Sequence, residues 1–171
     1  MPNQRVRRLL SYSLLAILGG LVACTIILGP HFHRMGTLLH GAESDNLALV
    51  WELRAIAHGE MDGSLSRLAN FPFGRRILFA TYSDPFVVGL ASWLARATNE
   101  VFTLNLLFAI GYLFSGASVF ALVLKLTSEV APSVVSGLAY MLLPYHQAMS
   151  QYHFSLSRLL ILPLFLSLIH I

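Results

Sequence analysis

The chain has 171 residues, of which 56% are hydrophobic and only 11% are charged. A soluble globular domain carries about 25% charged residues, and so few charges cannot cover a water-facing surface, so the composition favours a membrane protein. The net charge of +3 comes largely from the N-terminus, and no later segment interleaves basic with aromatic residues, which argues against nucleic acid as a partner.

The first predicted element is a transmembrane helix over residues 9–29, which contain no charged residue. Crossing the hydrocarbon core takes about 20 apolar residues. Residues 1–8 carry three arginines, so the positive-inside rule predicts a cytoplasmic N-terminus. A cleaved signal peptide is one alternative, but its apolar core has only about 7–15 residues. A lipoprotein signal ending at Cys24 is another, but the apolar run continues beyond that cysteine. We therefore expect a retained anchor.

Residues 30–100 are of mixed polarity and hold most of the acidic residues, and we predict that they form a long external loop. A short amphipathic helix is expected to begin at Ser44 or Asp45, because both are good N-cap residues and apolar positions follow. Residues 85–95 are apolar but too short to span a bilayer. They are predicted to form an interfacial or re-entrant helix, with Trp93 near the lipid headgroups.

The rest of the chain is predicted to cross the bilayer three more times. The expected segments are a second transmembrane helix at 101–124, a cytoplasmic turn at 125–132, a third helix at 133–149, an external turn at 150–157 and a fourth helix at 158–171. Gly111 and Ser115 would allow another helix to approach the second one closely. The fourth helix would cover only ~20 Å of a ~30 Å core, so we expect a fragment of a longer protein, inactive by itself. The predicted fold class is all-α, polytopic and transmembrane.

The external loop carries the most informative polar residues. Glu43 and Asp45 lie two residues apart at the start of the expected helix, where two carboxylates can bind a divalent cation or act as a base. The alternative is that Asp45 caps the helix and Glu43 is solvated. The histidine pairs His31/His33 and His146/His153 do not have a standard zinc spacing, so no metal site is predicted.

The order of these features resembles the bacterial GT-C glycosyltransferases, polytopic enzymes that use lipid-phosphate-linked sugars. The matching features are Glu43-Ser44-Asp45 after the first span, Asp45-Asn46-Leu47 running into Trp51, the segments 70–74 and 105–125, the run 137–140 before Pro144-Tyr145, and Leu162-Pro163-Leu164. Many members have a Gly-Asp or Asp pair where this chain has Ser44 before Asp45. The resemblance implies that Asp45 is the catalytic base and that Glu43 assists it or binds a cation.

The same resemblance implies a lipid-phosphate sugar donor, an unidentified acceptor, and a location in the bacterial inner membrane. The phosphate leaving group needs cations or hydrogen-bond donors nearby, for which the candidates are Arg75, Arg76 and Arg158. Arg158 could instead snorkel to hold a helix end at the interface. Tyr145 and His146 could line the substrate cleft, or be ordinary polar residues of the interface.

Two other classes of protein fit the same composition. One is a transporter or flippase-like membrane protein, and the other is a structural membrane subunit. A transporter is expected to place ionisable residues or broken helices at mid-bilayer depth, whereas here the predicted spans are nearly free of charge and the polar residues gather in one external loop. This distribution favours an enzyme with its site at the outer interface.

Overall fold

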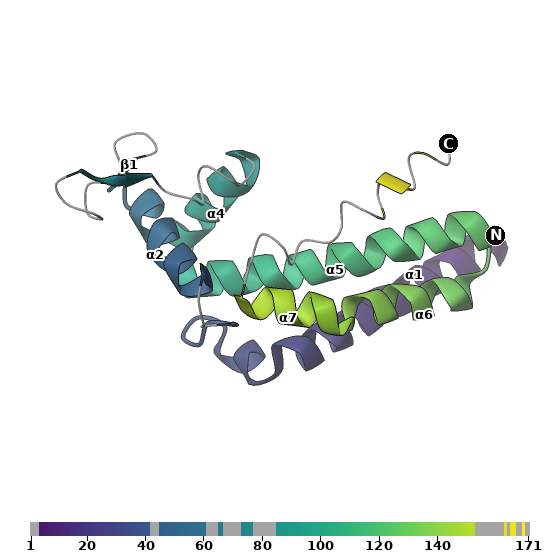
Figure 1. The fold of residues 1–171 in the computed structure, drawn as a ribbon. Coiled ribbons are helices and arrows are strands. Elements are labelled where there is room, and N and C mark those ends of the chain that lie inside the picture. The colour runs from purple at the N-terminus through teal and green to yellow at the C-terminus, as the bar shows by residue number, and fades with distance from the viewer. Residues whose placement is uncertain are drawn as a thin grey trace. The chain divides into compact units, whose positions relative to one another are not determined.

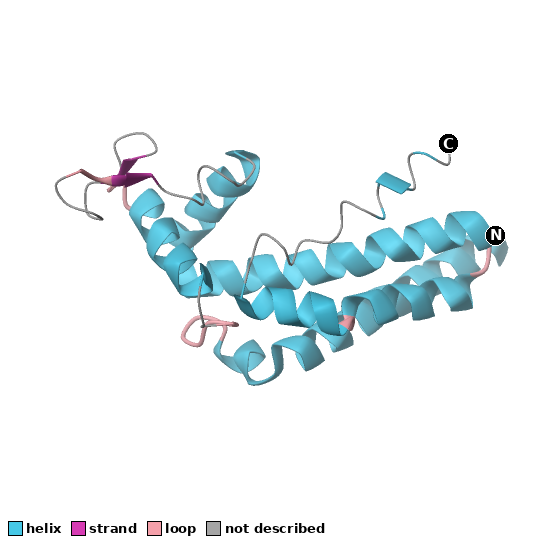
Figure 2. Ribbon diagram, viewed as in Figure 1, coloured by secondary structure: helices cyan, strands magenta, loops and turns pink. Residues whose placement is uncertain are grey.

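The structure is a computed structural model that describes residues 4–41, 45–60, 65–66, 73–76, 85–152, 163, 165–166 and 169. Every long element is a helix, which confirms the predicted all-α class (Figures 1 and 2). The strand pairing among the described residues is one two-residue antiparallel ladder, in which β1 (Leu65–Ser66) lies beside β2 (Arg75–Arg76) with Leu65 opposite Arg76.

The chain divides into two compact units. Unit 1 comprises residues 1–29, 109–148 and 157–171, and unit 2 comprises residues 30–108 and 149–156. Two helices contribute residues to both units. They are α5 (Glu100–Thr127) and α7 (Pro144–Tyr152).

Unit 1 is built from α1 (Gln4–Leu28), most of α5, α6 (Val130–Met141) and the start of α7. Its buried core draws one or two residues from each of the long helices, namely Ala23, Cys24, Tyr112 and Met141. The Cys24 thiol donates to the carbonyl oxygen of Ala109 on α5, 3.7 Å away. This small core, in which Tyr112 is the largest side chain, holds α1, α5 and α6 side by side (Figure 1).

The closest approach of α5 and α6 lies at Gly116 and Gly137. A Cβ atom on Gly137 would stand 2.8 Å from the carbonyl oxygen of Gly116, so only a glycine fits there. The sequence pattern had pointed to Gly111 and Ser115 for such a contact. Ser115 is buried, but its hydroxyl donates back to the Gly111 carbonyl within α5, 2.8 Å away, and the tight crossing lies one residue further along.

The segment predicted as a single third span, 133–149, contains two helices with a break at Leu142 and Leu143 (Figure 2). Proline disfavours helical geometry in the residue before it and fits the first position of a new helix, which explains why α7 begins at Pro144. The 12 residues of α6 extend only about 18 Å as a helix. By itself α6 is therefore shorter than the hydrocarbon core of a bilayer.

Unit 2 contains η1 (Gly29–Arg34, which begins at the unit boundary), α2 (Asp45–Ala57), α4 (Pro85–Ala97), the first residues of α5 and the last of α7. The predicted helices starting at residues 45 and 85 are both present. Helix α2 packs against α4 through a core rich in alanine and leucine, comprising Leu39, Leu53, Ala55, Ala57, Ala91, Ala95, Leu104, Leu107 and Phe108.

Helix α2 buries only part of the apolar set that its sequence predicts. Leu53 is buried as expected, but Leu47 is 61% exposed and Trp51 is 36% exposed. Two polar residues of the same helix, Asn46 and Glu52, are fully or almost fully buried. The helix therefore carries polar groups on its buried side and two large apolar side chains on its exposed side.

Of the helices formed by described residues, α5 alone is long and apolar enough to cross a membrane by length and composition. Only 33% of its most apolar stretch is buried. The apolar part of α1, Ala16–Leu28, and that of α4, Val87–Ala97, are shorter.

Candidate functional site

A buried asparagine, Asn46, joins three main-chain carbonyl groups in unit 2. Its side-chain amide donates to the carbonyl oxygens of Gly41 (2.9 Å), Ser150 (2.8 Å) and Gln151 (3.1 Å). Gly41 precedes the segment 42–45 and Asn46 follows it, so one amide group ties both ends of that segment to the end of α7.

A second buried asparagine, Asn105 on α5, fixes the chain that leads into this segment. Its amide nitrogen donates to the carbonyl oxygens of Met35 and Leu38, each 2.8 Å away, and its amide oxygen accepts from the backbone N–H of His40, also at 2.8 Å. Both polar atoms of the Asn105 amide group therefore bind the backbone of residues 35–40, which form turns rather than a helix or strand.

The imidazole of His40 completes the network. Its Nε2 lies 3.1 Å from the hydroxyl oxygen of Ser150, and its ring packs edge-on against Phe108 with centroids 5.2 Å apart. His40, Asn46, Asn105 and Ser150 are all buried. Hydrogen bonds between buried polar groups rigidify a structure, so this cluster holds Gly41 and Asn46 in place.

The predicted acidic residues lie at this place in the chain. Asp45 is the first residue of α2, and the structure describes its backbone. Glu43 lies outside the described residues. Gly41 and Asn46 lie on either side of the acidic segment, and the hydrogen bond between them joins its two ends.

The predicted cationic and cleft residues are distributed over several elements. Arg75 and Arg76 form β2, and Arg158 lies outside the described residues. Tyr145 and His146 are neighbours on α7 but differ in environment, since Tyr145 is 55% exposed and His146 only 1% exposed. The two residues therefore cannot both face the same open cleft.

His146 packs within unit 1. Its ring centroid lies 4.3 Å from that of Tyr112 on α5 and 6.4 Å from that of Tyr140 on α6. A buried imidazole between two tyrosines holds the start of α7 against the neighbouring helices. Of the two predicted residues, Tyr145 is the one available to a ligand at the surface.

Unit 1 contains an apolar cavity of about 300 Å³ between α1, α5 and α6. It is lined by small and apolar residues, among them Ala16, Gly20, Gly116, Phe120, Gly137 and Met141. This volume lies at the lower end of the range for small-molecule sites. The lining suits a hydrocarbon chain rather than a polar ligand.

Sequence reasoning missed the asparagine network and the cavity. A usable signal existed for Asn105, since an uncharged amide inside a long apolar run is costly to leave unpaired. Two of the three carbonyl groups that Asn46 binds are more than a hundred residues away, at Ser150 and Gln151, and no local spacing reveals them.

Within the described part of the chain, no group of three or more histidine, cysteine, aspartate or glutamate side chains could hold a metal ion. The chain matches no family model, no curated protein and no solved structure.

Proposed function

We propose that the chain is part of a multi-pass membrane glycosyltransferase that takes a sugar from a polyprenyl-phosphate donor at the outer face of the bacterial inner membrane. The observation that carries the proposal is the Asn46 anchor. Buried hydrogen bonds hold Gly41 and Asn46, which precede and follow the segment that contains Glu43 and Asp45. A carboxylate acts well as a base only when its backbone is held in place.

The membrane location is supported by the surface of unit 1. Large apolar side chains of α1 project outward along one side of the helix, namely Leu14, Ile17, Leu18, Leu21, Val22 and Ile26, each at least 47% exposed. A soluble protein rarely exposes so continuous an apolar surface. Helix α5 adds a stretch of sufficient length and hydropathy to span a bilayer.

In the proposed reaction the Asp45 carboxylate is the general base. The acceptor hydroxyl oxygen forms a bond to the anomeric carbon of the sugar as the bond between that carbon and the phosphate oxygen breaks. The carboxylate takes the proton of the acceptor hydroxyl, and polyprenyl phosphate leaves. Glu43 assists this carboxylate or holds a divalent cation.

The leaving phosphate requires positive charge, which Arg75, Arg76 and Arg158 supply in this proposal. Tyr145 is exposed and offers a hydroxyl to the same substrate, whereas the buried His146 supports the helix that carries it. The apolar cavity of unit 1 suits a segment of the polyprenyl chain.

The test compares Asp45→Asn with wild type in the full-length protein, in membranes supplied with radiolabelled polyprenyl-phosphate hexoses. Loss of a general base lowers the rate about 10²–10⁴-fold. Glu60→Gln is the matched control, because Glu60 is an exposed acid of the same unit that lies away from the segment 42–45. Wild-type transfer by Asp45→Asn would show that Asp45 is not the base. Running Glu43→Gln with and without a chelator separates the two roles considered for Glu43.

One observation favours a second candidate, a transporter or flippase-like protein. The break between α6 and α7 at Leu142 and Leu143 is a discontinuous helix, a feature of many transporter binding sites. Translocation of a fluorescent polyprenyl-phosphate analogue across proteoliposomes, with no sugar transferred, would favour this candidate over the enzyme.

A further inference from the structure

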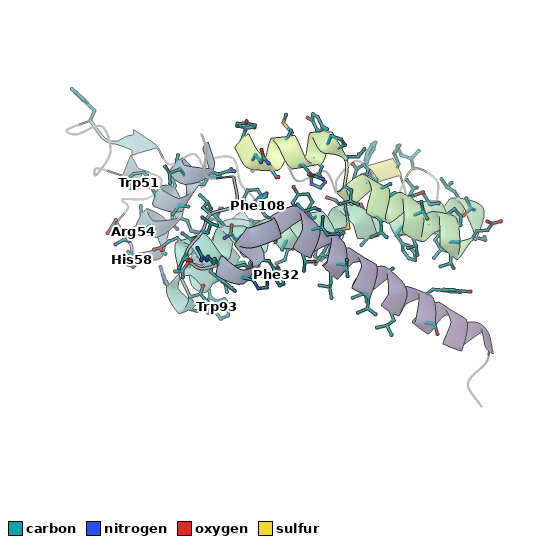
Figure 3. The ribbon with its side chains drawn as sticks, turned by 90° about the horizontal axis from the view of Figure 1, so that it is seen from below. Phe32, Trp51, Arg54, His58, Trp93 and Phe108 are labelled. Atoms are coloured by element: carbon teal, nitrogen blue, oxygen red, sulfur yellow. The ribbon has the colours of Figure 1, made fainter. Side chains whose placement is uncertain are left out.

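The exposed side of α2 carries an ordered row of large residues. Leu47, Trp51, Arg54 and His58 follow one another at spacings of three or four residues, and all are exposed. Figure 3 labels the last three of them. Residues at these spacings share a helix face. The stripe therefore runs from an aliphatic group through an indole to a cation.

Helix α4 repeats the order. Its exposed stripe carries Leu90 (42% exposed), Trp93 (65% exposed) and Arg96, again at spacings of three residues. Trp93 projects from α4 as Trp51 does from α2 (Figure 3). Two neighbouring helices of unit 2 thus present leucine, tryptophan and arginine in the same sequence along their axes.

The two stripes meet at their cationic ends. The Nε of Arg96 donates to the main-chain carbonyl of Ala57, the last residue of α2. His58 follows directly, and its Nδ1 lies 3.8 Å from a carboxylate oxygen of Glu100. Glu60, two residues after His58, is an exposed acid. Helices α2 and α4 pack together, and the Arg96 bond joins their C-terminal ends. We call the two stripes together the Leu–Trp–Arg face.

We propose that the Leu–Trp–Arg face docks onto the headgroup region of an anionic lipid bilayer. Its order matches the depth profile of a membrane, with leucine at the acyl boundary, tryptophan at the interface and arginine at the phosphates. The stripes carry cations and no acid, which suits negatively charged headgroups. Tryptophan and arginine are also common at protein–protein interfaces. Binding a protein would not, however, require two helices to carry leucine, tryptophan and arginine in the same order.

The proposal relies on the membrane location inferred above and not on sugar transfer. Trp51 and Trp93 are the only two tryptophans of the chain, so intrinsic fluorescence reports this face without any label. The full chain is reconstituted into vesicles of phosphatidylcholine with 30% phosphatidylglycerol. Phospholipids spin-labelled at the headgroup or high on the acyl chain should quench the emission strongly, and aqueous acrylamide should quench it weakly. Trp51→Phe and Trp93→Phe assign the signal to each helix.

Strong acrylamide quenching with no lipid quenching would overturn the inference. Protection from acrylamide in native membranes but not in vesicles would overturn it in favour of a protein partner. Resistance to extraction by alkaline carbonate is measured in parallel. If the chain resists extraction while its tryptophans are not quenched by lipid, the docking proposal is wrong and the membrane location is retained. If carbonate extracts the chain, the docking proposal and the membrane location are both wrong.

The contribution of the arginines to lipid binding can be measured separately. Replacing one of them, in Arg54→Gln or Arg96→Gln, should weaken lipid docking about fivefold, seen as a higher fraction of phosphatidylglycerol needed for half-maximal lipid quenching. Arg34→Gln is the matched control, because Arg34 is an exposed arginine of unit 2 outside both stripes. Quenching that does not depend on anionic lipid, in wild type and variants alike, would refute the electrostatic part.

Discussion

The side-chain amide of Asn46 donates a hydrogen bond to the main-chain carbonyl of Gly41, 2.9 Å away, and so connects the two residues that flank the segment 42–45. The same amide reaches Ser150 and Gln151 on α7. Gly41 and Asn46, which flank four residues that include two acids, are thereby anchored in a buried polar network.

Removal of this amide should be costly. Asn46→Ala takes a donor from three carbonyl groups and should lower the free energy of unfolding by about 2–4 kcal/mol, measured by denaturant titration in detergent micelles. Asn99→Ala is the matched control. Asn99 caps α5 through one bond to the N–H of Phe102, so its loss should cost about 1 kcal/mol. Equal losses in the two variants would contradict the central role of Asn46.

Gly41 should tolerate no side chain. Its φ is +62°, and a Cβ atom would stand 2.6 Å from the Cα of Gln151. We expect Gly41→Ala to lower the free energy of unfolding by about 2–5 kcal/mol, from backbone strain and overpacking together. Gly59 separates the two effects, because its φ is +71° with no atom within 4 Å. Gly59→Ala should cost only about 1–2 kcal/mol in the same titration.

The sequence predicted where the helices of unit 2 begin, but it did not predict which side of α2 is buried. Asp45 as a helix start and the apolar helix after Pro85 were both predictable, because capping and hydrophobicity act over a few residues. The burial of Asn46 and the exposure of Trp51 were not. Helical periodicity predicts which residues are buried by assuming that apolar side chains avoid water. It fails where the helix does not face water. It also fails where a polar side chain is buried by hydrogen bonds to residues about a hundred positions away.

The same limit explains the third predicted span. Residues 133–149 are uncharged throughout, so hydropathy alone joins α6 and α7 into one segment. Pro144 is a recognisable helix start, yet proline also occurs within transmembrane helices. Hydropathy alone therefore does not distinguish a proline that begins a new helix, as Pro144 does here, from a proline within one continuous span.

The crossing of α5 and α6 predicts a contrast between two glycines. Gly137→Ala brings a methyl group within 2.8 Å of the Gly116 carbonyl oxygen, which is backbone and cannot swing away. It should destabilise the protein by about 1–3 kcal/mol. Gly89 lies on the exposed side of α4 with nothing within 4 Å, so Gly89→Ala should stabilise by up to about 1 kcal/mol through helix propensity alone. Thermal unfolding in micelles measures both, and a neutral Gly137→Ala would refute the close crossing.

Cys24 provides a direct test of the packing of unit 1. It is the only cysteine, and it is buried against α5. A water-soluble maleimide should label it at least tenfold more slowly than a thiol at Thr127→Cys in a Cys24→Ala background, because buried thiols are inert. Thr127 is exposed at the end of α5. Both positions should react fully in dodecyl sulfate. Rapid labelling of native Cys24 would place α1 apart from α5.

The partners of Asn46 also set an order of events during translation. Its bonds to Ser150 and Gln151 bridge 104 and 105 positions of the chain. At about 5–20 residues per second, a ribosome that has just made Asn46 needs roughly 5–20 s more before those carbonyls exist. Asn46 is therefore synthesised well before the carbonyl groups of α7 that bind its amide. In nascent chains arrested before residue 150, α2 should be cleaved by proteases more readily than in the finished chain.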